Sequence, residues 1–181
     1  AADATLGRVA EATGATSEPG DVARGARALR ALGRMREANE AYRAATSRAP
    51  NDAAINTGWG ELFLDAHQND EALKSFHAAL QADPKWTPAL IGSALALADD
   101  NPPQAVAAAK HALEVDPSLV EADVFLAAQA ASADARADAR HWLERALAVN
   151  PSSLDAHAGL AALDYVEDKQ ADFEAEVAKV L

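Results

Sequence analysis

Four prolines recur at nearly constant intervals, and this feature constrains the fold more than any other. They stand at positions 50, 84, 117 and 151, so the intervals are 34, 33 and 34 residues. Because proline cannot continue a helix and disfavours helical geometry in the residue before it, each proline is expected to end one helix. A period of this length is typical of an array of helical repeats. An alanine stands five residues and another twelve residues before each proline, namely Ala45, Ala79, Ala112 and Ala146, and Ala38, Ala72, Ala105 and Ala139.

The period predicts a set of paired helices. We expect them at residues 20–33 with 36–48, 52–66 with 70–82, 86–98 with 103–115, 119–132 with 135–149, and 153–166 with 170–181. Residues 3–13 are expected to form a weak capping helix. The eight alanines should be buried, because small residues let paired helices approach closely. The third repeat is one residue short, and we place the deletion in its turn, at residues 99–103.

The residues between these markers carry a recognisable pattern. The second repeat reads Trp59-Gly60 and then Phe63, and large residues stand between the paired alanines at Tyr42, Phe76 and Leu143. This resembles the tetratricopeptide-repeat family, whose pattern is Trp-x2-Leu-Gly-x2-Tyr, then Ala-x3-Phe, then Pro. The resemblance covers units at about 19–52, 53–86, 87–119, 120–153 and a truncated 154–181, after an N-terminal segment 1–18. Three departures, Ala109, Asp123 and His157, lead us to expect looser packing in the repeats that contain them.

The resemblance implies an all-α fold: an α-solenoid of antiparallel helical hairpins, about 4.5–5 units in a right-handed superhelix. It also implies that the first helix of each pair lines a concave groove that binds another polypeptide. On that basis the candidate groove residues are Arg24, Arg27, Arg30, Glu61, Asp65, Ile91, Leu95, Phe125 and Tyr165.

Two features of these groove positions each have two interpretations. The arginines are suited to an acidic peptide, because guanidinium groups pair with carboxylates, or Arg27 pairs with Glu61 one repeat later. The apolar strip through the third to fifth repeats is suited to a partner helix or an extended segment, or its small residues close the groove on itself. Both pairs of interpretations stay open at this level.

Charge and motifs exclude several classes of function. The net charge is −12, which disfavours nucleic acid as a partner, and no stretch of the sequence is apolar enough for membrane insertion. The chain has no cysteine, and its five histidines show no metal-ligand spacing, so we expect them on the surface. No nucleotide-binding or nucleophile motif occurs. We therefore expect no enzymatic activity, no cofactor and no metal, and the sequence indicates no compartment.

The leading hypothesis is a scaffold that binds a peptide or partner protein in the groove. One alternative is the recruitment region of a larger enzyme or regulator, and another is a self-associating structural array. The last predicted helix carries an apolar stripe of Phe173, Val177, Val180 and Leu181, with no cap helix after it. We therefore expect a fragment cut inside a repeat, and self-association through this helix.

Overall fold

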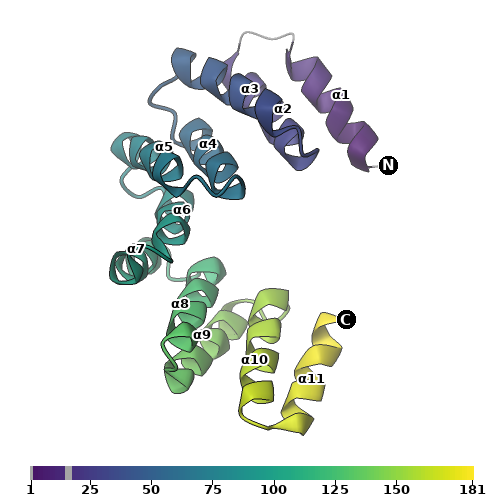
Figure 1. The fold of residues 1–181 in the computed structure, drawn as a ribbon, viewed down its shortest axis with the longest axis vertical. Helices are drawn as coiled ribbons and strands as arrows, with labels where there is room; N and C mark the ends of the chain where they lie inside the picture. The colour runs from purple at the N-terminus through teal and green to yellow at the C-terminus, as the bar shows by residue number, and fades with distance from the viewer. Residues whose placement is uncertain (1, 15–17) are drawn as a thin grey trace. The chain divides into compact units, whose positions relative to one another are not determined.

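Helices account for nearly all of the structure, a computed structural model that describes residues 2–14 and 18–181 (Figure 1). Within those ranges there are eleven α-helices and no strand. The predicted all-α fold is confirmed, and every predicted helix end lies within two residues of an observed one. The helices are α1 (Ala2–Gly14), α2 (Pro19–Ala31), α3 (Met35–Arg48), α4 (Ala53–Asp65), α5 (Asn69–Ala82), α6 (Thr87–Leu97), α7 (Pro102–Val115), α8 (Val120–Ser132), α9 (Arg136–Val149), α10 (Leu154–Val166) and α11 (Gln170–Val180).

The chain divides into two compact units, Ala1–Ala96 and Leu97–Leu181. In the first unit α1 packs on α2, α2 pairs with α3, and both contact α4, which pairs with α5. In the second unit α7 packs on α8, α8 pairs with α9, and α9 packs on α10, which pairs with α11. The single array over residues 19–181 stays a prediction, and residues 1 and 15–17 of the segment before it lie outside the described residues.

The turns inside four of the helix pairs share one backbone conformation. Each contains one residue with positive φ, a region that glycine and aspartate tolerate better than most residues: Gly33, His67, Asp134 and Asp168. The pair α6–α7 differs, because its two helix starts are 15 residues apart instead of the 16 found in the other four pairs. No residue from 98 to 101 has a positive φ. The deletion predicted in this turn is therefore confirmed.

The core lies where small residues meet large ones. All eight marker alanines are at most 1% exposed, which confirms their predicted burial. The ring of Phe76 in α5 lies between two glycines: a Cβ added at Gly60 or Gly92 would fall 2.6 or 2.4 Å from a ring atom. A glycine inside a helix costs roughly 0.5–1 kcal/mol relative to alanine, and here it makes room for a fully buried aromatic ring.

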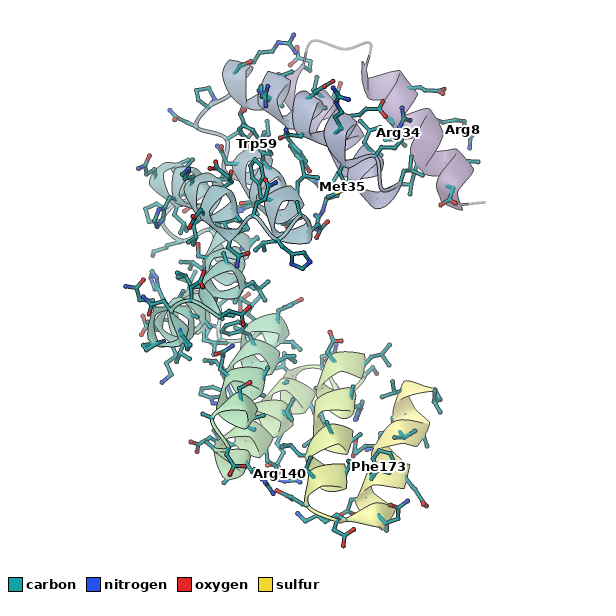
Figure 2. The ribbon with its side chains drawn as sticks, viewed as in Figure 1. Arg8, Arg34, Met35, Trp59, Arg140 and Phe173 are labelled. Atoms are coloured by element: carbon teal, nitrogen blue, oxygen red, sulfur yellow. The ribbon has the colours of Figure 1, made fainter. Side chains whose placement is uncertain are left out.

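Two tryptophans of the first unit are held by hydrogen bonds from their indole nitrogens. Trp59 Nε1 donates to Asn39 Oδ1 at 2.8 Å, and Trp86 Nε1 donates to Thr57 Oγ1 at 3.0 Å. Both rings pack against buried clusters of that unit, and Trp59 is labelled in Figure 2. They therefore serve packing in this structure.

Candidate functional site

Arg30 is the centre of the predicted arginine surface, but it is fully engaged within the molecule. From α2 it reaches two acids of α4: its Nε lies 2.5 Å from Asp65 Oδ2, and its Nη1 lies 2.5 Å from Glu61 Oε2. The hydrogen bond to Asp65 raises the pKa of Arg30 and lowers that of Asp65. The interpretation that paired Arg27 with Glu61 was wrong, because Arg30, one turn further along α2, takes both acids.

The other two arginines differ from each other. Arg24 is exposed and pairs with Asp21 on its own helix. Arg27 is exposed and forms no ion pair within the described part of the chain. It lies near the buried hydroxyl of Tyr42, where burial raises the tyrosine pKa and the guanidinium partly opposes that effect. Only one of the three predicted arginines is therefore left available for an acidic ligand.

The predicted apolar positions are also divided. In the first unit Ile91 is half-buried and Leu95 is 49% exposed. In the second unit Tyr165 is 70% exposed and its ring lies 5.7 Å from that of Phe173, which is labelled in Figure 2. Phe125 is only 8% exposed, so its assignment to an open groove surface was wrong.

A size pairing across 16 residues explains the burial of Phe125. A Cβ added at Gly58 would fall 2.7 Å from Tyr42, one at Gly92 would fall 2.4 Å from Phe76, and one at Gly159 would fall 2.7 Å from Leu143. At the same spacing the third repeat has a small Ala109 and a large Phe125, both buried, on the packed helices α7 and α8. The bulky residue therefore comes from the opposite helix in this layer, and the layer stays filled.

Two polar residues that were expected to loosen the packing are buried instead. Asp123 is fully buried and its Oδ1 accepts a hydrogen bond from Arg145, which also donates to the carbonyl of Pro117 at 2.8 Å. His157 is 6% exposed, so its predicted surface position was wrong; its Nδ1 lies 2.6 Å from Glu176 and its Nε2 lies 2.9 Å from the carbonyl of Pro151. Both side chains are satisfied by local partners at the start of their repeats.

The second unit contains an apolar groove of about 410 Å³ between α8 and α10, with α9 as its floor. Val124, Ala128 and Ala162 were placed by the resemblance on the groove side of their helices, and all three line it. Sequence reasoning missed the floor and the ends of the groove. The remaining lining residues are Ala127, Ala131, Asp134, Arg136, Ala139, Leu143, Asp155, Gly159, Leu163 and Val166.

The surroundings of this groove are strongly acidic. Residues 97–181 carry 16 Asp and Glu against 6 Lys and Arg, a net charge of −10, whereas residues 1–96 carry the remaining −2. Of the charged residues that line the groove, Asp134 and Arg136 pair with each other at 2.9 Å. Asp155 is exposed and has no ion-pair partner within the described ranges. The groove therefore combines an apolar lining with an excess of negative charge.

A second hollow, of about 530 Å³, lies between α10 and α11. Its lining includes Tyr165, Phe173 and Val177, and α11 itself contains no buried residue. Phe173 stands at the position where the four preceding repeats have an alanine, and a side chain of this size keeps α11 from the close approach that alanine permits. Self-association through this surface stays a prediction.

The described residues show no group of three or more His, Asp or Glu side chains placed to hold a metal ion. Nor do they include a helix with the length and apolar character that a membrane crossing requires.

Comparison with known proteins agrees with this architecture. Residues 25–52 match the family model for the tetratricopeptide repeat. A search of curated protein sequences finds no match. Among solved structures, a thermophilic tetratricopeptide-repeat protein of Thermus thermophilus is 21% identical, with 90% of both chains covered and a TM-score of 0.79.

Two further similar structures come from pilus-related proteins. PilW, described as a type IV pilus biogenesis factor, is 20% identical over 90% of this chain and 76% of its own, with a TM-score of 0.79. PilF of Pseudomonas aeruginosa is 15% identical over 88% of this chain and 73% of its own, with a TM-score of 0.74. At these identities the likeness concerns the fold. The chain thus carries a tetratricopeptide repeat at residues 25–52 and has the helical fold of tetratricopeptide-repeat proteins.

Proposed function

We propose that this chain is a protein-interaction module that binds a segment of a partner protein in the groove between α8 and α10. Tetratricopeptide-repeat proteins bind protein partners, and they are generally scaffolds that are not enzymes. The observation that carries the proposal is the groove itself: an apolar hollow of about 410 Å³ whose walls are mostly alanine, glycine and valine. Short side chains leave room for the side chains of an incoming segment, and burial of apolar surface favours its binding.

The arginine surface of the first unit has weaker support as the binding site. Arg30 is occupied by Glu61 and Asp65, and Arg24 by Asp21. An acidic peptide would have to displace those carboxylates before it could bind. The groove in the second unit requires no such displacement.

The proposal predicts that polar bulk in the groove abolishes binding. Peptides selected from a random library displayed on phage, with the purified chain as bait, are expected to lose at least about tenfold in affinity for an Ala128→Gln/Ala162→Gln variant. Both alanines are exposed and helical, so the variant should fold normally, because glutamine is a good helix former. Fluorescence anisotropy with synthetic peptides measures the affinities.

Ala148→Gln is the matched control, because Ala148 is an exposed alanine of α9 that does not line the groove. It should leave the affinity unchanged. Peptides that bind the groove variant as tightly as the unmodified chain would place the binding site elsewhere, and a selection that yields no binder would remove the support for peptide binding.

A further inference from the structure

The shape and charge of the groove restrict what it binds. The restriction rests on the proposed function, because it concerns the occupant of the same groove. Three observations bear on it: the spacing of the lining residues, the length of their side chains, and the charge around them.

The lining residues recur at helical intervals on both walls. On α8 they include Val124, Ala128 and Ala131, and on α10 they include Gly159 and Ala162. Such residues lie about one helical turn apart, which is about 5.4 Å along the axis. The walls therefore present their gaps with a repeat of one turn.

An occupant fits these gaps best when its own side chains have the same repeat. Side chains on one face of an α-helix recur every turn, so ridges of an incoming helix match the gaps along the groove. On one face of an extended strand they recur every two residues, or about 6.8 Å. Over three turns this difference accumulates to about 4 Å, roughly the width of a methyl group and its contact distance. The spacing favours a helix over an extended segment.

Charge identifies the polar face of that helix. The second unit carries a net charge of −10, and Asp155 is an exposed carboxylate of the groove lining without an ion-pair partner among the described residues. Arg136, the single cation of the lining, is already paired with Asp134. An acidic helix would meet repulsion along the whole unit, whereas a basic one would be attracted to it.

We infer that the groove takes a basic amphipathic helix of the partner, with small apolar side chains facing α8 and α10 and Lys or Arg on its flanks. The short lining side chains receive the apolar face, and Asp155 faces a flanking cation. Attraction between exposed charges is screened by salt, so the preference for a basic flank should weaken as ionic strength rises.

Four synthetic peptides test this inference. The first is helical, with Ala and Leu on one face and Lys elsewhere. The second has the same apolar face with Glu in place of Lys. The third is the lysine peptide in scrambled order, without an apolar face, and the fourth is the first with a central proline that prevents a continuous helix.

The lysine helix is expected to bind at least about tenfold more tightly than each of the other three at low salt, with a smaller advantage over the glutamate helix at high salt. Asp155→Asn should weaken the lysine helix and leave the glutamate helix unaffected or stronger. Equal binding of the lysine and glutamate helices, or of the proline peptide, would overturn the inference while the proposed function stands, provided that Ala128→Gln/Ala162→Gln abolishes the binding. If the lysine helix binds no better than its scrambled form and ignores that variant, the proposed function fails with the inference.

Discussion

Replacing Arg145 by methionine is expected to reduce the free energy of unfolding by about 3–5 kcal/mol at neutral pH, because it leaves a buried charge without its partner. Asp123 is fully buried, and Arg145 is the residue whose guanidinium bonds its Oδ1. The second oxygen, Oδ2, has no hydrogen-bond partner among the described residues. The same substitution also removes the hydrogen bond to the Pro117 carbonyl. Urea unfolding monitored by circular dichroism measures the loss.

The loss should depend on pH in a defined direction. Burial raises the pKa of Asp123 in the folded chain, and Arg145 partly opposes this rise. Without Arg145 the folded pKa rises further, so the folded state binds a proton more tightly than the unfolded state. The variant is therefore least destabilised below the unfolded pKa of about 4, and it loses up to about 1.4 kcal/mol per pH unit as the pH rises towards the folded pKa.

The double variant Asp123→Leu/Arg145→Met is the control, since it removes both charges and puts leucine where the third repeat has Leu90. It should recover most of the stability, with a pH profile no steeper than that of the unmodified chain. An Arg145→Met variant with the pH profile of the unmodified chain would show that Asp123 is solvated once its partner is gone.

The second large effect concerns the reversed size pair. Phe125→Ala is expected to cost about 3–5 kcal/mol, because it leaves a cavity in a layer whose other member, Ala109, is also small. Ala109→Phe alone should cost about 1–3 kcal/mol through overpacking. The double variant Ala109→Phe/Phe125→Gly restores the arrangement of Phe76 with Gly92, and it should be more stable than either single variant.

A double-mutant cycle of unfolding free energies provides the measurement. Phe173→Ala is a matched control, since Phe173 is a half-buried phenylalanine of the same unit and should cost much less. Strictly additive losses for positions 109 and 125 would mean that the two side chains do not share one layer.

Much of the fold was predictable from the sequence because its markers are local. The four prolines end helices wherever they occur, and the paired alanines mark close helix crossings whatever their partners are. The single-residue deletion was also predictable, because it breaks a period that the flanking repeats define. These features depend on backbone geometry and side-chain size, both of which are encoded residue by residue.

The site was less predictable because it depends on choices between alternative contacts. Arg27 and Arg30 lie one turn apart on α2, and a spacing of one repeat favours Arg27 for Glu61. Arg30 instead reaches both Glu61 and Asp65, and the gain from two carboxylates decides the pairing. A long side chain has several partners within reach, and sequence spacing does not rank them.

Phe125 illustrates a signal that was present and missed. Its repeat position places it on the groove side, but the spacing of 16 residues that relates Tyr42 to Gly58 and Phe76 to Gly92 also relates it to Ala109. A small residue where an aromatic is expected indicates that its counterpart fills the space. The floor of the groove follows the same rule, since Leu143 stands 16 residues before Gly159.

Hydrogen exchange of the chain with and without the bound lysine helix tests the location of binding most directly, because amide protection reports where a ligand orders the backbone. The account predicts slower exchange in residues 124–131 of α8 and 155–166 of α10, with no change in α3 or α5 of the first unit. Protection confined to α2 and α4, or to residues 173–181 of the last helix, would contradict the account and assign binding to the arginine surface or to the hollow between α10 and α11.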